Sequence, residues 1–361
     1  MRLGSIISEA LRNIGSGTAH AVIMFLAVLL AGTLLGGYEA ASVIGLEREA
    51  TTRITAFADT TTIMGAAIDG SVCDRLPDAA NGPSMAGAMR VGDQLTPAST
   101  PGKDIASYQI TPGMIDMLTA NDSTGRTDAD ASGIWVSSDV ARDFGLAVGG
   151  PFDTNHGTAT VAGVFDWPND GRDTRFVYAI LVPVSATDGT FTECWAKQWP
   201  ASDQTETLLY STVVASDGQN PAGVMAVNKG FDSHYDAQSG YLNRMTRWTP
   251  FAALAVGLLL GIVAVRRRRL EYAGALHSGQ TKGAQLLGIT LETLIWGGSA
   301  SAASASLLIA YCARMSQSDP AAVLVAALRT PVALFAGVMV ASVLSGLTIR
   351  ESQLFRFFKN R

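Results

Sequence analysis

Residues 248–265 read WTPFAALAVGLLLGIVAV and are followed at once by RRRR at 266–269. The apolar stretch carries no charged residue. At a rise of ~1.5 Å per residue, a helix of this length crosses the hydrocarbon core of a bilayer. Arginines next to a span remain on the cytoplasmic side of the membrane. The stretch therefore predicts a transmembrane helix whose carboxyl end faces the cytoplasm.

Three further runs have the length and composition of membrane spans. They cover residues 18–40, 286–312 and 331–349. The third span of the chain is rich in Gly and Ser, which allow close packing of helices, and only Glu292 interrupts it. A cleaved signal peptide is the alternative for the first run, but its apolar stretch is too long for one. We therefore expect four transmembrane helices.

The charges of the chain separate into two groups. Segments 1–17, 266–285 and 350–361 together hold eleven basic and three acidic residues, a net charge of +8. Residues 41–247 hold 25 acidic and 13 basic residues, a net charge of −12. Because basic residues near span ends stay inside, both termini are expected in the cytoplasm and 41–247 outside.

The fold class follows from this layout. We predict a membrane protein with four transmembrane α-helices (1 + 3) and a large mixed α+β extracytoplasmic domain between helices one and two. The expected segments are a cytoplasmic N-terminal segment (1–17), transmembrane helix 1 (18–40), the extracytoplasmic domain with its stalk (41–247), transmembrane helix 2 (248–265), a cytoplasmic coupling helix (266–285), transmembrane helix 3 (286–312), an extracytoplasmic loop (313–330), transmembrane helix 4 (331–349) and a cytoplasmic tail (350–361). Charged residues make up only 16% of the chain, against about a quarter in soluble domains. This composition excludes a simple soluble enzyme and a basic nucleic-acid binder.

The extracytoplasmic domain shows both helical and strand patterns. Strands are expected at residues 60–68, 105–110, 158–165, 176–182 and 208–215, helices at 38–57, 112–120, 137–144 and 220–229, and surface loops at 78–104, 121–133 and 166–174. The helix at 38–57 would continue the first span outward as a stalk. Residues 321–327, just before the last span, are expected to lie along the membrane surface.

Two of the three cysteines fall in the extracytoplasmic domain. Cys73 and Cys194 lie where disulfides persist, and we expect them to pair; two separately buried thiols are the alternative. Cys312 lies inside the third span, where a thiol packs as a small apolar group.

Motifs for catalysis are missing from the sequence. It has no phosphate-binding GxxxxGK[ST], no HExxH, no CxxC and no GxSxG. No metal site and no cofactor are therefore expected in this chain. Glu292 admits two interpretations, a proton or substrate relay and a buried hydrogen-bonding group. We favour the second.

Residues 266–285 read RRRRLEYAGALHSGQTKGAQ. A stop-transfer cluster followed by a short loop explains the arginines but not the rest of this segment. Leu270, Ala273 and Leu276 fall on one helical face, and Gly279 ends the helix. The pattern predicts a short helix on the cytoplasmic face between two spans. Such a helix can dock into another protein.

The link segment resembles that of the FtsX-like, MacB-type (type VII) permeases of ABC transporters. Their pattern R-x-x-E-[FY]-A-x-x-x-x-x-G matches Arg268, Glu271, Tyr272, Ala273 and Gly279. Further similarities are Leu-Glu-Thr-Leu at 291–294, Ser-Glu-Ala-Leu-Arg-Asn-Ile at 8–14, and the stretches 134–149 and 160–164 of the outer domain. The Glu-Cys-Trp at 193–195 is similar to actinobacterial members.

The resemblance implies a permease in the bacterial plasma membrane that works as a dimer with two copies of a separate ABC ATPase. ATP and Mg would be bound by that ATPase, and residues 268–279 would form the coupling helix. Its candidate ATPase-coupling residues are Arg268, Arg269, Glu271, Tyr272 and Gly279. The second protomer would be the same or a homologous chain. Membrane lipid and an extracellular or lipoprotein partner complete the expected contacts.

Three functions remain open at this point. The chain could be a permease for efflux or extraction of a peptide, lipid or other amphiphile. It could instead regulate an extracellular cell-wall hydrolase mechanically. The third alternative is a sensor or receptor subunit without cargo.

Overall fold

The computed structural model describes residues 3–119, 131–216, 221–232 and 235–353. The chain divides into two compact units, which we call the helical unit (1–48 and 239–361) and the sheet unit (49–238). The loop expected at 121–133 lies mostly outside the described residues, and so does most of the tail expected at 350–361.

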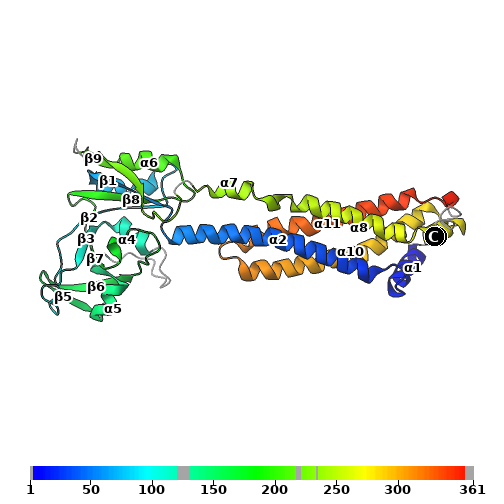
Figure 1. Ribbon diagram of the computed structural model, residues 1–361, viewed down its shortest axis with the longest axis horizontal. Coiled ribbons are helices and arrows are strands. Elements are labelled where there is room, and N and C mark those ends of the chain that lie inside the picture. Colours follow the sequence, from blue (N-terminus) through cyan, green and yellow to red (C-terminus); the bar gives the residue numbers. More distant parts are fainter. Residues whose placement is uncertain (1–2, 120–130, 217–220, 233–234, 354–361) are drawn as a thin grey trace. The chain divides into compact units, whose positions relative to one another are not determined.

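The helical unit consists of long helices joined by short turns (Figure 1). Its elements are α1 (Leu3–Gly15), α2 (Ala21–Thr55), which continues into the sheet unit, η3 (Met245–Trp248), α8 (Thr249–Arg267), α9 (Arg269–His277), α10 (Lys282–Met315), α11 (Pro320–Thr348) and η4 (Glu351–Gln353). The short helix α7 (Ala237–Leu242) precedes η3. Among the described residues, four helical stretches are long and apolar enough to cross a membrane: Ala21–Thr55, Ala237–Arg267, Lys282–Met315 and Pro320–Thr348. One precedes the sheet unit in the sequence and three follow it.

Glycines allow the long helices to pack backbone against backbone. A Cβ on Gly257 of α8 would lie 2.2 Å from the carbonyl oxygen of Leu334 in α11. On Gly337 of α11 it would lie 2.5 Å from the carbonyl oxygen of Leu254. Small residues at such crossings are typical of membrane helix bundles, where close approach supplies the packing energy.

The sheet unit is built on one mixed sheet. Its strands are β1 (Thr60–Asp69), β2 (Met85–Val91), β3 (Ala106–Ile110), β4 (Ile134–Ser137), β5 (Pro151–Thr154), β6 (Gly157–Phe165), β7 (Ala179–Pro183), β8 (Thr190–Lys197), β9 (Val213–Ser216) and β10 (Gly223–Ala226). The order is β10-β1-β8-β2-β3-β7-β4-β6-β5, and β9 pairs with β1. The pairs β3–β7 and β4–β6 are parallel, and the other pairs are antiparallel.

Short helices accompany the sheet: α3 (Gly70–Asp74), η1 (Leu76–Asp78), α4 (Pro112–Thr119), α5 (Ser138–Phe144), η2 (Thr174–Phe176) and α6 (Asp203–Tyr210). Helix α5 begins where the Ser137 side chain accepts a hydrogen bond from the Val140 amide, and it ends at Gly145 with φ of +63°. The first is a regular N-cap, and the second is a regular glycine C-cap.

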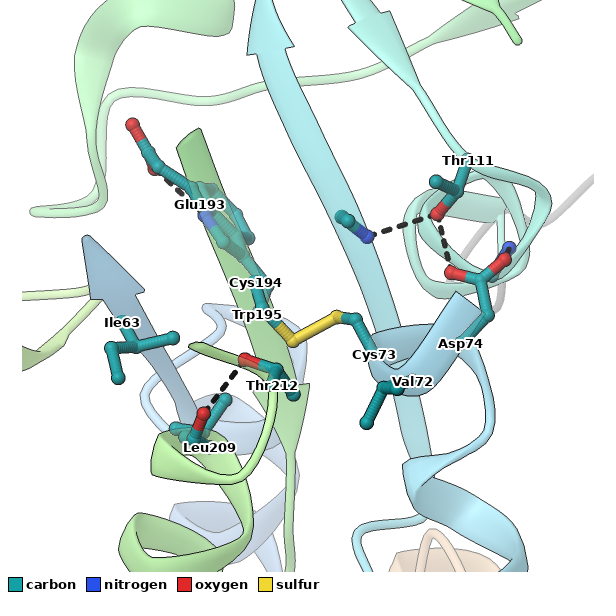
Figure 2. Close-up of a disulfide and its surroundings, with 12 residues drawn as sticks. Ile63, Val72, Cys73, Asp74, Thr111, Glu193, Cys194, Trp195, Leu209 and Thr212 are labelled. Carbon is teal, nitrogen blue, oxygen red and sulfur yellow. Dashed lines mark hydrogen bonds between the residues drawn. A yellow bond between two sulfur atoms is a disulfide. The ribbon is translucent and has the colours of Figure 1, made fainter. Parts of the chain in front are cut away.

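A disulfide joins α3 to the central strand β8 (Figure 2). Cys73 and Cys194 are both fully buried, in a core that includes Ile63 and Leu209. Their Cα atoms are 6.0 Å apart, and 121 residues separate them in the sequence. The bond therefore ties distant parts of the sheet unit together.

Three sequence expectations are corrected by the structure. Residues 220–229, expected as a helix, contain strand β10, which pairs with β1. Residues 208–215, expected as one strand, hold the end of α6 and the start of β9. The expected loop 78–104 contains β2, which lies between β8 and β3. Residues 321–327 form the first turns of α11, because Pro320 begins the helix and the Asp319 side chain caps it; their expected position along the membrane surface stays a prediction. The loop before α11 is accordingly shorter than the expected 313–330.

Candidate functional site

The link between α8 and α10 folds into one short helix, α9. Arg268 stands between α8 and α9 with a non-helical φ of −107°. At the other end Gly279 has φ of +94°, a conformation that side chains other than glycine adopt only with strain. The amide of Gln280 donates to the carbonyl of Ala275 at 3.0 Å, which closes the helix. Two backbone breaks therefore set α9 as a separate element.

Arg268 fixes α9 to the base of α10. Only 6% of its surface is exposed. Its guanidinium donates to Glu271 at 2.8 Å, to the Tyr272 hydroxyl at 2.9 Å and to Glu292 of α10. Because three side chains accept hydrogen bonds from this buried guanidinium, Arg268 acts as a buried anchor for the link helix.

Glu292 connects the same anchor to α1. Its second oxygen accepts a hydrogen bond of 2.8 Å from the Asn13 side chain. Glu292 is 5% exposed, so its charge is balanced by Arg268 and by the Asn13 amide. The side chains of α1, α9 and α10 thus meet at one carboxylate, which places Glu292 as a buried hydrogen-bonding group.

Burial shapes the protonation of this cluster. Desolvation raises the pKa of Tyr272 far above its usual value, and Glu292 adds to the effect. For Arg268, desolvation lowers the pKa, but Tyr272 and Glu292 outweigh it and the pKa is raised. The hydroxyl therefore stays neutral and the guanidinium charged at physiological pH.

The remaining coupling candidates lie around this anchor. Glu271 exposes half of its side chain, and Arg269 is partly exposed at the first position of α9. His277, at the other end, contacts Glu351 at 2.9 Å on the surface. The structure therefore brings Arg268, Glu271, Tyr272 and Glu292 together, and Gly279 lies at the end of the helix.

A second buried charge pair lies within the helical unit. Glu39 of α2 is 2% exposed and accepts hydrogen bonds of 2.8 and 3.1 Å from Arg244. Thr249, at the start of α8, donates to its other oxygen at 3.4 Å. This pair fastens α2 to the segment that leads into α8.

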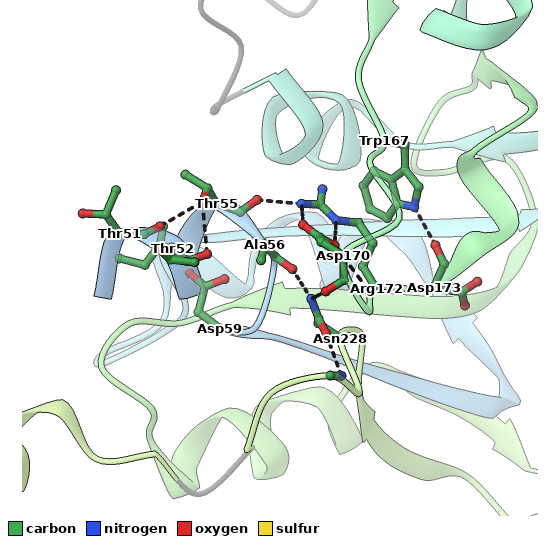
Figure 3. A network of polar contacts seen from close by, with 12 residues as sticks. Thr51, Thr52, Thr55, Ala56, Asp59, Trp167, Asp170, Arg172, Asp173 and Asn228 are labelled. Carbon is green, nitrogen blue, oxygen red and sulfur yellow. Dashed lines mark hydrogen bonds and ion pairs between the residues drawn. The ribbon is translucent and has the colours of Figure 1, made fainter. Parts of the chain in front are cut away.

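The carboxyl end of α2 is held by three side chains of the sheet unit, of which Figure 3 shows Arg172 and Asn228. Lys197 of β8 donates to the carbonyl of Ile54 at 2.8 Å. Arg172 donates to the carbonyl of Thr55 at 2.9 Å, and Asn228 to the carbonyl of Ala56 at 2.7 Å. These are carbonyls that a helix end leaves without intrahelical partners, and cations are favoured there by the helix dipole. We call Lys197, Arg172 and Asn228 the helix-end clamp.

Aromatic contacts reinforce the helix-end clamp. Phe57, which follows the helix end, has φ of +57° and is buried. The Arg172 guanidinium lies 5.0 Å from the Phe57 ring centre and 4.8 Å from that of Trp167. The Lys197 ammonium lies 4.5 Å from the Phe57 ring centre. Cations over aromatic faces are attractive at these distances, so the last turn of α2 is fixed to the sheet.

Sequence reasoning missed Asn13, Glu39 and the helix-end clamp. Their partners lie far away in the sequence, so no local pattern reveals the contacts. The sequence signal that could have found them is a charged or amide residue inside an apolar or strand segment. Lys197 at the end of β8 is an example. In the part of the chain that the structure describes, no group of His, Cys, Asp or Glu side chains could hold a metal ion.

No protein-family model matches the chain, and no curated protein does. Among solved structures, it is similar to the periplasmic region of MacB from Actinobacillus actinomycetemcomitans, with 12% identity and a TM-score of 0.37 over 48% of this chain and 92% of that one. It is also similar to the extracellular domain of the ABC-type transporter YknZ from Gram-positive bacteria, with 16% identity and a TM-score of 0.30 over 41% and 88%. A domain of a protein from Porphyromonas gingivalis, described as a permease, matches with 15% identity and a TM-score of 0.33 over 52% and 97%.

Proposed function

We propose that this chain is the permease subunit of an ABC transporter in a bacterial plasma membrane. A separate ATPase, present in two copies, would bind ATP and Mg and move α9 as it closes. The chain would pass this motion to its extracytoplasmic domain for efflux or extraction of a peptide, lipid or other amphiphile. The chain would supply no catalytic residue of its own.

The observation that carries the proposal is the joint of α1, α9 and α10 at Glu292. A short exposed helix that merely linked two spans would need no buried ion pair, because exposed loops are satisfied by water. Here Arg268 and Asn13 bring two further helices onto one carboxylate. A push on α9 would therefore reach both α10 and the helix that leads into α2.

The order of helices and strands along the chain also supports the permease proposal. One apolar helix, a mixed sheet unit and three apolar helices follow one another along the chain. The basic flanks of the spans favour cytoplasmic termini and a cytoplasmic α9. A second protomer, of the same or a homologous sequence, would complete the membrane part.

Affinity purification tests the proposal. The full chain would be isolated in a mild detergent with ATP and Mg under conditions that block hydrolysis, and co-purifying chains would be identified by mass spectrometry. We expect an ABC ATPase in a ratio of one copy per permease chain. Recovery of the permease without any ATPase under these conditions would contradict the proposal.

A further inference from the structure

A cavity of about 270 Å³ lies between α1, α9 and α10. Its lining includes the apolar side chains of Ile6, Ala10, Ala275 and Ile289 and the polar side chains of Glu9, Glu271 and Gln285. Each of the three helices contributes both kinds. A cavity lined by both apolar and polar side chains fits a ligand that has an apolar stem and a polar end.

The charged side chains that line the cavity are mostly acidic, although the surrounding segments are basic. Glu9, Glu271 and Glu292 line the cavity with Arg268 as the cation. Arg268 is bonded to Glu271 and Glu292, whereas Glu9 makes no ion pair within residues 3–119, 131–216, 221–232 and 235–353. One positive charge thus faces three carboxylates, so the site favours a further cation.

Gln285 gives a second, independent observation that points to a ligand in this cavity. Its side chain is 2% exposed and lines the cavity. The Lys282 ammonium donates to its carbonyl oxygen at 3.1 Å, which fixes the direction of the amide. The amide nitrogen, Nε2, has no hydrogen-bond partner among the described residues. A buried donor without a partner costs free energy, so the ligand should bring an acceptor.

We propose that this cavity receives a lysine or arginine side chain from a loop of the partner ATPase. The aliphatic stem would lie along Ile6 and Ile289, and the charged end would reach Glu9 and Glu271. A backbone carbonyl of the same loop would accept from Gln285 Nε2. The exposed Arg266 and Arg267 nearby favour a partner loop in which acidic residues flank this one basic residue.

The inference rests on the proposed function, and crosslinking tests it on the intact complex. A photoreactive amino acid replaces Ala275 in the full chain, and the ATPase recovered with the wild-type permease serves as the probe. We expect a crosslink to an ATPase peptide that carries a lysine or arginine. Crosslinks to lipid alone, as a zwitterionic headgroup in the cavity would give, or to the permease alone would overturn the inference.

A second experiment reverses the charges of Glu9 and of the crosslinked ATPase residue. Glu9→Lys should lower ATPase retention by at least about tenfold, since truncating a buried charge pair costs more than one decade in affinity. Changing the crosslinked basic residue of the ATPase to Glu should restore retention. The matched control is Glu206→Lys, which reverses an exposed carboxylate of α6 in the sheet unit that does not line the cavity, and this variant should retain the ATPase. The milder Glu9→Gln should also reduce retention if Glu9→Lys disturbs folding.

Failure of this inference can be separated from failure of the proposed function. If the wild-type chain retains no ATPase, the proposed function fails. If the wild-type and both Glu9 variants retain the ATPase equally, the proposed function stands and the cavity has been assigned wrongly.

Discussion

At the scale of single residues, several buried charges of the structure lie beside an opposite charge. The Lys197 and Asp59 side chains are 6% and 1% exposed and lie 3.0 Å apart. Burial raises the pKa of Asp59 and lowers that of Lys197, and their mutual attraction opposes both shifts. Such buried pairs give geometric specificity. The loss of folding stability is largest when only one partner is removed, because the other charge then stays buried without a partner.

Lys197→Ala should therefore destabilise the protein strongly. It leaves the Asp59 carboxylate buried and the carbonyl of Ile54 without its cap. We expect a loss of about 3–5 kcal/mol in the free energy of unfolding, measured by chemical denaturation of the full chain in detergent. Arg142→Ala, which breaks the exposed pair with Asp139, is the control and should cost less than about 1 kcal/mol. Equal effects of the two variants would refute the role given to the helix-end clamp.

The lowered pKa of the Asp173 carboxylate predicts that the folding stability of the chain depends on pH. Burial raises its pKa, but hydrogen bonds from Arg175 outweigh burial and the net pKa lies below the ordinary 3.8. Since the folded-state pKa is lowered, the carboxylate stabilises the fold above about pH 4. This stability is lost as the pH falls through the lowered pKa.

The measurement compares wild type with Asp173→Asn. The difference in unfolding free energy should be largest near neutral pH and shrink progressively below about pH 4. A difference that stays constant from pH 7 to pH 3 would show that the ionised form of Asp173 contributes nothing.

At the scale of elements, α9 depends on the glycine that ends it. Gly279 has φ of +94°, and a Cβ there would meet no atom within 4 Å, so the cost of a side chain is conformational. Gly274, inside α9, has open space and no positive φ. The two glycines therefore respond in opposite ways to the same substitution.

Gly279→Ala should raise the hydrogen-exchange rate of α9 amides severalfold, because a left-handed alanine costs roughly 1–2 kcal/mol. Gly274→Ala should slow exchange, because alanine stabilises a helix interior by about 1 kcal/mol over glycine. Hydrogen exchange with mass spectrometry on peptides covering residues 266–281 measures both. Slower exchange in Gly279→Ala would contradict the proposed helix end.

The same scale shows what sequence patterns can and cannot predict. The apolar helices and α9 could be predicted because length, charge and a terminal glycine are local signals. Strand β2 was missed because its small residues do not alternate in polarity; a Cβ on Gly87 would lie 2.1 Å from the backbone of α4. Strand β8 was missed because it is central and buried over most of its length. Tertiary contacts decide such strands, and the helix-end clamp likewise exists only after folding.

At the scale of the whole molecule, the disulfide joins two distant parts of the sheet unit. Replacing both Cys73 and Cys194 by Ser removes a cross-link that closes 121 residues. The chain-entropy model gives a loss of about 4–5 kcal/mol, and native disulfides commonly contribute about 2–5 kcal/mol. Thermal unfolding of the full chain should show a lower midpoint for the double variant.

Maleimide labelling with mass spectrometry supplies the control. Under denaturing conditions without reductant, only Cys312 should react, because it is the free cysteine. With reductant, all three cysteines should react. Labelling of three thiols without reductant would show that the bond is absent.

The central claim is that ATP binding by a partner ATPase moves this chain through α9. Hydrogen exchange on the purified complex, compared with and without trapped ATP and Mg, tests it most directly. We predict slower exchange in α9 and α1 and an altered exchange rate in the last turn of α2 and in the sheet unit when ATP is bound. The same exchange in both states, with the ATPase bound throughout, would contradict the account.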